Sequence, residues 1–210
     1  MDLLREFFAR LHNFPDLIRW GGLTALTIIV FAETGLLVGF FLPGDSLLVT
    51  AGLLAAIDGR LSVLQMCVVI SLAAIIGDTV GYGIGRYLGV KLYSRPDSRL
   101  FRREHLMKSH AFYEKYGPKT IVLARFVPIV RTFAPTVAGA ATMDYRKFVV
   151  YNIMGGISWV CSMLLIGRFL AQHIPNAEKN IHWIAIIIIV LSFLPIAKEW
   201  LQARREKPSA

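Results

Sequence analysis

The sequence predicts an all-α protein that crosses a membrane several times. Of its 210 residues 55% are hydrophobic and 18% are charged, and the mean hydropathy is +0.56. A soluble domain carries about 25% charged residues. Several apolar runs reach the length of about 20 residues that a helix needs to cross the bilayer. Two runs are interrupted by proline beside charged residues, so we predict an inverted repeat of two re-entrant helical hairpins with transmembrane helices and an N-terminal amphipathic helix.

The chain is predicted to form a single membrane domain, 1–210. Segment 1–14 has apolar side chains on one helical face and charged ones elsewhere, which is typical of a helix lying in the membrane interface. The segments that follow are a first re-entrant unit (17–57), a transmembrane helix (61–85), a cytoplasmic basic loop (86–118), a second re-entrant unit (119–143), two more transmembrane helices (146–170 and 181–198) and a cytoplasmic tail (199–210).

The basic residues lie mainly between the apolar runs. The formal net charge is +9, and residues 86–119 hold nine Lys or Arg against three acidic residues. Cytoplasmic loops of membrane proteins carry this excess, so the loop and the C-terminus are predicted to be cytoplasmic. Anionic lipid headgroups are therefore the expected partner of the positive charge, and no nucleic-acid partner is predicted.

The first broken run carries two acidic residues. Residues 20–42 are apolar except for Glu33, and the helix is expected to end at Leu42, before Pro43, Gly44 and Asp45. The following apolar stretch, 46–57, is too short to span and is predicted to be a re-entrant arm. Whether residues 20–42 span fully or form the long arm of this hairpin stays open.

The second broken run, 119–143, carries two basic residues, Arg125 and Arg131, and two prolines, Pro128 and Pro135. Both prolines are expected to interrupt it. A charge at the bilayer centre costs on the order of 3 kcal/mol. We therefore expect the acidic residues of the first hairpin to balance the arginines of the second.

Short motifs recur between the two halves of the chain. Phe41-Leu42-Pro43 recurs as Phe126-Val127-Pro128, Ala51-Gly52 as Ala138-Gly139, and residues 84–88 as residues 166–170. If the basic ends of the two spans face opposite sides, the copies are inverted, as in many secondary transporters. Glycines at every fourth position (Gly77, Gly81, Gly85 and Gly89) predict close packing with another helix.

Three further polar or aromatic residues are candidates for supporting roles. Asp78 is interpreted as a helix cap or interfacial residue, with a proton-relay role as the alternative. Asn152 is expected to form an interhelical hydrogen bond rather than to contact a ligand. Trp159 lies within the same predicted span.

Enzymatic chemistry is not predicted. Residues 44–47 spell GDSL, the signature of a hydrolase family with a serine nucleophile, but that chemistry also needs a downstream Asp-x-x-His, which the chain lacks. There is no Walker A loop, no HExxH and no Cys/His cluster with zinc spacing, so neither a cofactor nor a metal is expected.

The charged hairpins and the neighbouring motifs resemble the DedA family of bacterial inner-membrane proteins, which is related to the eukaryotic VTT-domain lipid scramblases. The matching stretches are ETGLLVGFFLPGDSLL (33–48), GDTVGYGIGR (77–86), ARFVPIVRTFAPTVAG (124–139) and Tyr151-Asn152 with Trp159. The resemblance implies a fold with two re-entrant hairpins, location in the inner membrane, and proton-coupled translocation of undecaprenyl phosphate.

These residues suggest a transport mechanism. Arginine binds phosphate through a planar fork and stays ionised, so Arg125 and Arg131 are predicted to bind the lipid phosphate. Glu33 and Asp45 would then lose their partners and take up a proton. The alternatives are a proton-coupled transporter of small solutes or ions and a non-transporting scaffold, and a homo-oligomer remains open.

Overall fold

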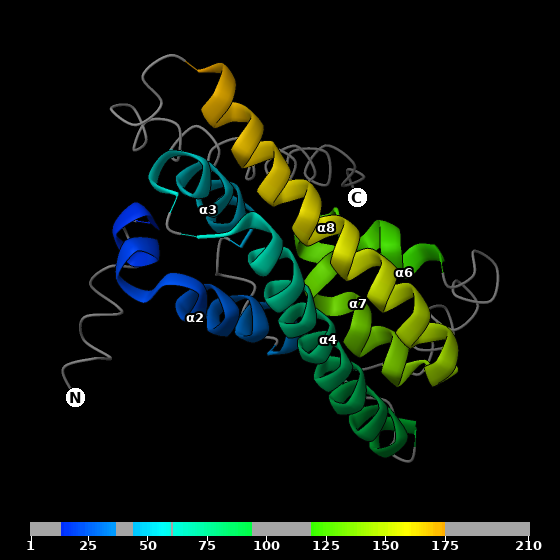
Figure 1. Cartoon of the computed structure of the whole chain (residues 1–210). Coiled ribbons are helices and arrows are strands. Elements are labelled where there is room, and N and C mark those ends of the chain that lie inside the picture. The colour runs from blue at the N-terminus through cyan, green and yellow to red at the C-terminus, as the bar shows by residue number, and fades with distance from the viewer. Residues whose placement is uncertain (1–13, 37–43, 60, 94–118, 175–210) are drawn as a thin grey trace, which may run out of the picture. The chain divides into compact units, whose positions relative to one another are not determined.

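The computed structural model describes residues 14–36, 44–59, 61–93 and 119–174, and the regular secondary structure among them is entirely helical. Its helices are α2 (Phe14–Gly35), α3 (Gly44–Asp58), α4 (Val63–Tyr93), α6 (Lys119–Ala124), α7 (Pro128–Ala140) and α8 (Tyr145–His173) (Figure 1). Three are long and apolar enough to cross a membrane: α2, α4 over Val63–Gly89, and α8. The prediction of a helical membrane protein is confirmed. Most of the predicted interfacial helix and basic loop, and all of the last span and the tail, lie outside the described residues.

The described helices divide into two compact units. Unit 1 contains the start of α2, with α3 and the end of α8, within residues 14–26, 44–63 and 163–174. Unit 2 contains the rest of α2, with α4, α6, α7 and most of α8, within residues 27–36, 64–93 and 119–162. Helix α2 is kinked at Gly22, where φ is 52°, a backbone conformation that glycine adopts without steric cost.

In unit 1, α3 packs against α8 at two glycines. A Cβ at Gly52 would overlap the carbonyl oxygen of Leu164, and a Cβ at Gly167 would overlap that of Val49. Because only glycine permits backbones to meet this closely, these residues set the spacing of the pair.

In unit 2, α4 packs against α7 in the same way. A Cβ at Gly85 would overlap the carbonyl oxygen of Thr136, and a Cβ at Gly139 would overlap that of Tyr82. Further along α4, Gly77 meets the backbone of Gly35 in α2, and Gly89 meets Ala140. The packing role predicted for the glycines of α4 is therefore confirmed.

An aromatic cluster fixes the turn between α7 and α8. The Tyr82 hydroxyl donates to the carbonyl oxygen of Met143 over 2.5 Å, and the ring of Tyr82 stacks on that of Phe148 with centroids 4.5 Å apart. Asp144 caps the start of α8, since its side chain accepts from the backbone N–H of Lys147 over 3.0 Å.

Several helix ends differ from the predictions. Helix α2 is described as far as Gly35, and its predicted end at Leu42 lies outside the described residues. Helix α4 continues beyond the predicted boundary at residue 85 to Tyr93. The second broken run is interrupted only before Pro128, and Pro135 lies inside α7. Proline removes one backbone donor, and α7 continues through that loss.

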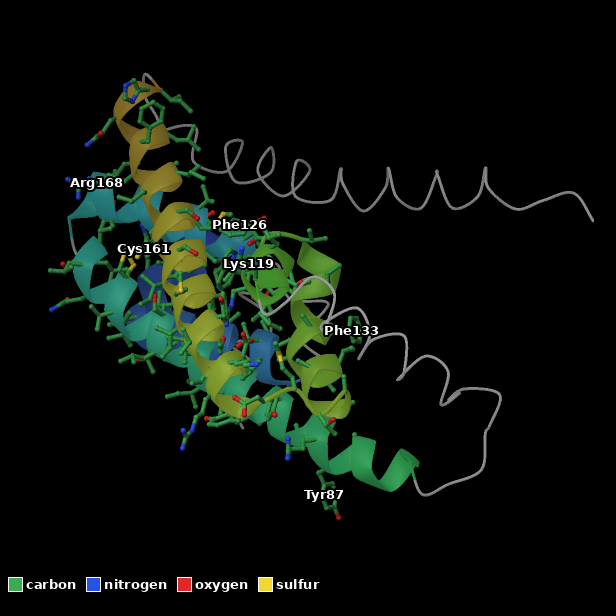
Figure 2. All side chains as sticks on the ribbon, turned by 90° about the vertical axis from the view of Figure 1, so that its right-hand side faces the viewer. Tyr87, Lys119, Phe126, Phe133, Cys161 and Arg168 are labelled. Atoms are coloured by element: carbon green, nitrogen blue, oxygen red, sulfur yellow. The ribbon has the colours of Figure 1, made fainter. Side chains whose placement is uncertain are left out.

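Large apolar side chains lie on the outer surface. Tyr87, Phe126 and Phe133 are 63%, 48% and 42% exposed, and they project from α4, the turn before α7, and α7 (Figure 2). Exposed side chains of this size suit contact with lipid tails.

Candidate functional site

The break between α6 and α7 positions both arginines of the second broken run. The backbone N–H groups of Arg125 and Val127 donate to Val122 and Ala124, at 3.3 and 3.1 Å, so α6 ends in a tight turn. Pro128 begins α7, where its missing N–H costs no helical hydrogen bond. Arg131 lies one turn into α7, and its N–H donates to the Val127 carbonyl over 2.9 Å.

Arg131 pairs with Glu33 of α2. Its Nη2 donates to Oε1 of Glu33 over 2.7 Å, and the two side chains are 4% and 2% exposed. The guanidinium carbon lies 4.5 Å from the ring centroid of Trp159 of α8, which is fully buried. The arginine therefore has a carboxylate partner and an aromatic face, both of which attract its positive charge.

Arg125 pairs with Asp78 of α4. Its Nη2 donates to Oδ2 of Asp78 and to Oδ1 of Asn152 in α8, and all three side chains are buried. The Asn152 amide in turn donates to the carbonyl oxygen of Ile75 over 3.0 Å. Helices α4 and α8 thus hold the guanidinium from two sides.

Glycines on α8 make room for this arginine. A Cβ at Gly155 would lie 3.1 Å from Cδ of Arg125, and one at Gly156 would lie 3.6 Å from its Nη1. The guanidinium therefore lies beside the backbone of α8, without a large side chain between them.

The two ion pairs are fully removed from solvent, which sets their energetics. Desolvating two opposite charges costs about as much as their attraction returns, so such pairs add little net stability. Removing one partner leaves an uncompensated buried charge and costs about 3–5 kcal/mol. Unit 2 therefore contains four buried charged side chains, and replacing any one of them alone by an uncharged residue should destabilise the fold.

The predicted site residues are placed as follows. Glu33 lies against Arg131, as charge balance suggested, but the partner of Arg125 is Asp78. The interpretation of Asp78 as a cap or interfacial residue is wrong, since it is buried and paired inside unit 2. The prediction for Asn152 is confirmed by its interhelical hydrogen bonds.

The remaining predicted residues belong to the first hairpin. Asp45 is partly buried in the first turn of α3, and Gly44 is the first residue of that helix. Both belong to unit 1, and Pro43 lies outside the described residues. The participation of Asp45 alongside the arginines stays a prediction.

Asp78 was the residue that sequence reasoning undervalued, and a signal was available. It lies well inside an apolar run that is long enough to span, and a carboxylate there needs a cation nearby. Counting it with Glu33 and Asp45 would have identified three acids to be balanced by two arginines.

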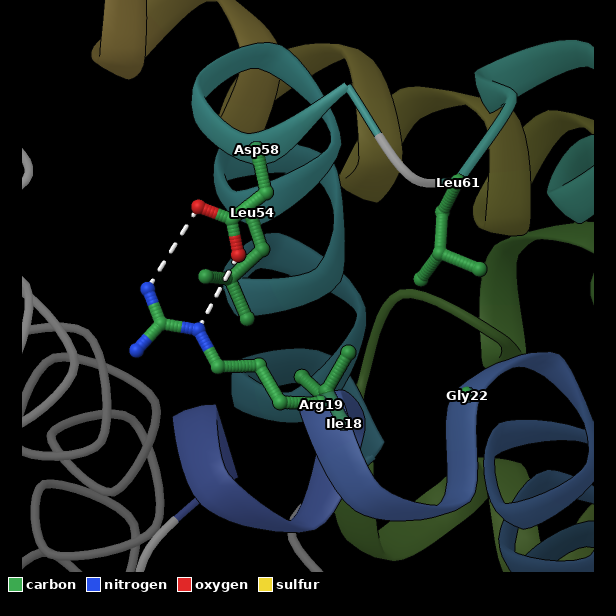
Figure 3. Close-up of a pocket in the computed structure, with 6 residues that line it drawn as sticks. All are labelled: Ile18, Arg19, Gly22, Leu54, Asp58 and Leu61. Atoms are coloured by element: carbon green, nitrogen blue, oxygen red, sulfur yellow. Dashed lines mark hydrogen bonds and ion pairs between the residues drawn. The ribbon is translucent and has the colours of Figure 1, made fainter.

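Unit 1 has a different charged feature. Arg19 of α2 pairs with Asp58 of α3 over 3.0 Å, with side chains 40% and 17% exposed, at the rim of a small pocket of about 70 Å³ (Figure 3). The rest of the lining is Ile18, Gly22, Leu54 and Leu61. Across 14–36, 44–59, 61–93 and 119–174, no three His, Cys, Asp or Glu side chains are grouped closely enough to hold a metal ion.

Comparison with known proteins agrees with this arrangement of motifs. Residues 42–169 match the VTT domain. The chain is also 51% identical over 181 residues to Protein DedA of Escherichia coli K12, covering 86% of this chain and 82% of that protein. The chain belongs to the VTT-domain (DedA) family. The stretch that matches the VTT domain includes Asp78 and both arginines.

Two other relatives are similar to the chain over most of its length. The chain is 44% identical over 194 residues to the uncharacterized membrane protein Rv0364 of Mycobacterium tuberculosis H37Rv, covering 90% of this chain and 84% of that protein. It is 36% identical over 148 residues to the inner membrane protein YqjA of Escherichia coli K12, covering 70% and 66%. No solved structure matches the chain.

Proposed function

We propose that this VTT-domain protein moves a polyprenyl phosphate carrier lipid, undecaprenyl phosphate, across the bacterial inner membrane, coupled to protons. The observation that carries the proposal is the pair of buried arginines, Arg125 and Arg131, each held by a carboxylate inside unit 2. A lipid phosphate is an anion that must cross an apolar layer, and buried guanidinium groups are the donors that bind it best.

The proposed cycle is an exchange of anions on the arginines. When the phosphate binds Arg131, Glu33 loses this cationic partner in a region from which water is largely excluded. A buried ionised carboxylate that has lost its cation is costly, so we propose that it takes up a proton and releases it when the phosphate leaves. Asp45 is proposed to act in the same cycle from the first turn of α3.

The family fold supports the same proposal. The recurrent motifs and the equivalent glycine contacts of α3 with α8 and of α4 with α7 are what an internal repeat would produce. We include in the proposal two re-entrant hairpins of opposite orientation, with residues 86–118 and the C-terminus in the cytoplasm. Broken helices that meet within the membrane are the usual site of substrate binding in secondary transporters.

Reconstitution tests the function directly. Purified protein in liposomes should move a fluorescent polyprenyl phosphate between leaflets, and the rate should rise with an imposed proton gradient. The lysine variants Arg125→Lys and Arg131→Lys keep the charge and lose the fork, so transport should fall by about tenfold or more. Normal transport by both variants would contradict binding through the guanidinium forks.

Glu33→Gln tests whether Glu33 carries the proton that is coupled to transport. This variant should transport lipid at a rate that no longer depends on the proton gradient, because the exchangeable carboxyl is gone. A gradient response equal to that of the wild type would remove Glu33 from the coupling.

A proton-coupled transporter of small solutes is the second candidate. The buried acid–arginine pairs favour it, because the same groups could bind a small anion. Gradient-dependent uptake of inorganic phosphate or another small anion, without movement of polyprenyl phosphate, would favour this candidate. Neither activity would leave a non-transporting scaffold.

A further inference from the structure

Asp78 and a substrate phosphate would bind the same arginine. The Oδ2 atom of Asp78 accepts from Nη2 of Arg125, and the two side chains are 1% and 2% exposed. A phosphate oxygen is an acceptor of the same kind and charge. An anion that approaches Arg125 therefore meets a donor that is already engaged by an internal carboxylate.

The guanidinium of Arg125 nevertheless has unused capacity. Among the described residues no group accepts a hydrogen bond from its Nε or Nη1, although both atoms are buried, and Oδ1 of Asp78 also has no donor. Buried polar atoms are nearly always hydrogen-bonded, so unsatisfied donors on a buried arginine indicate a further acceptor. The internal partners satisfy only one nitrogen of the fork.

Asn152 makes the site asymmetric. Its Oδ1 is an uncharged acceptor for the same Nη2 of Arg125, and its Nδ2 donates to the Ile75 carbonyl. An amide supplies an acceptor oxygen, whereas a carboxylate also balances the charge of the buried guanidinium. Asp78 instead contributes a full negative charge, which attracts the arginine and repels any other anion in the same place.

We infer that Asp78 is an internal competitor for Arg125, which a phosphate must displace before this arginine can bind it. The inference rests on the proposed function and adds a residue that limits affinity for the substrate. Besides Arg125, the charged group that acts on Asp78 is Arg131 of α7, which is itself paired with Glu33 of α2. Displacement of Asp78 thus takes place next to a second arginine that can share the incoming phosphate.

Two isosteric substitutions with opposite predicted effects test this inference. Asp78→Asn keeps the size of the side chain and an acceptor oxygen but removes the competing charge. Asn152→Asp adds a second competing carboxylate on the same Nη2. The matched control is Asp58→Asn, which makes the same chemical change to an acid paired with an arginine in unit 1.

The measurement is the Kd of the full-length chain in detergent for farnesyl phosphate, with farnesol and inorganic phosphate as parallel probes. Asp78→Asn should bind farnesyl phosphate about tenfold more tightly than the wild type, and Asn152→Asp about tenfold more weakly, as expected for one charged hydrogen bond gained or lost. Asp58→Asn should leave the Kd unchanged. A merely structural Asp78 would not raise affinity when replaced.

Each outcome has a distinct meaning. If the wild type binds farnesyl phosphate and Asp78→Asn binds it equally or more weakly, Asp78 is not a competitor. If Asp78→Asn does not fold, as judged by its melting curve, Asn152→Asp decides, and an unchanged or tighter Kd for that variant overturns the inference. If the wild type binds farnesyl phosphate no better than farnesol, the proposed function itself fails. If inorganic phosphate shows the same changes as farnesyl phosphate, the competition stands and concerns the phosphate group alone.

Discussion

Two helix pairs, α3 with α8 and α4 with α7, are built on the same contact and carry different chemistry. In each pair a glycine meets the carbonyl of the residue three positions before the partner glycine. Yet the described part of unit 1 has no charged side chain as buried as those of unit 2, where two arginines and two acids are at most 4% exposed. The same glycine packing therefore occurs in a unit with buried charged side chains and in a unit whose described charged side chains are more exposed.

The two units differ in where their charged side chains lie. Close glycine contacts pack the two helices of each pair without large side chains. The remaining faces of these helices are therefore available for contacts with other helices. In unit 2 those faces hold the arginines, and in unit 1 Arg19 and Asp58 remain partly exposed. Four predictions test the comparison.

The largest effect is expected from loss of the buried ion pair. Arg125→Ala leaves Asp78 without its cation in the interior and should lower the free energy of unfolding by about 3–5 kcal/mol, measured by titration with SDS in mixed micelles. The matched change in unit 1, Arg19→Ala, should cost less than about 1 kcal/mol, because that pair is partly exposed to solvent. Equal losses would contradict the contrast between the two units.

The glycine contacts should be equivalent in the two helix pairs. Gly85→Ala and Gly167→Ala each force a methyl group against a carbonyl of the facing helix, and each should cost about 1–3 kcal/mol in the same unfolding assay. Gly83→Ala is the control, because nothing lies within 4 Å of its added methyl group. That variant should be neutral or more stable by up to about 1 kcal/mol. An unchanged free energy of unfolding for only one of Gly85→Ala and Gly167→Ala would show that the two helix pairs do not pack equivalently.

A smaller effect is expected from Trp159. Trp159→Phe retains a ring near Arg131 but weakens the cation–π attraction, so the free energy of unfolding should fall by about 1 kcal/mol. Trp20→Phe, at a partly exposed position in unit 1, should change it by less than about 0.5 kcal/mol. Similar losses at both tryptophans would mean that the contact with Arg131 contributes nothing specific.

The smallest effect is expected at the exposed pair of unit 1. Asp58→Asn should cost below about 1 kcal/mol at low salt, and the loss should disappear in about 1 M NaCl because exposed charges are screened. Asp78→Asn serves as the comparison, since a buried pair is screened much less. A loss at Asp58 that salt does not alter would show that this pair behaves like a buried one.

Much of the fold could be predicted from residue patterns. The apolar runs identified the helices around residues 63–89 and 145–173, and Pro128 marked a true helix start because proline is accepted at the first helical position. The glycine repeat of α4 correctly indicated close packing. Pro135 was interpreted wrongly, since local propensity does not state whether a helix will continue through a proline.

The charged centre could be predicted only in part. An apolar neighbourhood around Glu33, Arg125 and Arg131 requires compensation, and this requirement is visible in the sequence. The choice of partner is not, because Asp78 lies 47 positions from Arg125 along the chain, on another helix.

Residue types and their order were sufficient to establish that this chain is a helical membrane protein whose interrupted segments carry charge, because the cost of charge in an apolar layer depends on composition and not on detailed geometry. Three-dimensional packing decided which acid meets which arginine: Glu33 with Arg131, and Asp78 with Arg125. That choice depends on helix rotation and on close backbone approach at glycines over distances of a few ångströms, which no local pattern in the chain encodes.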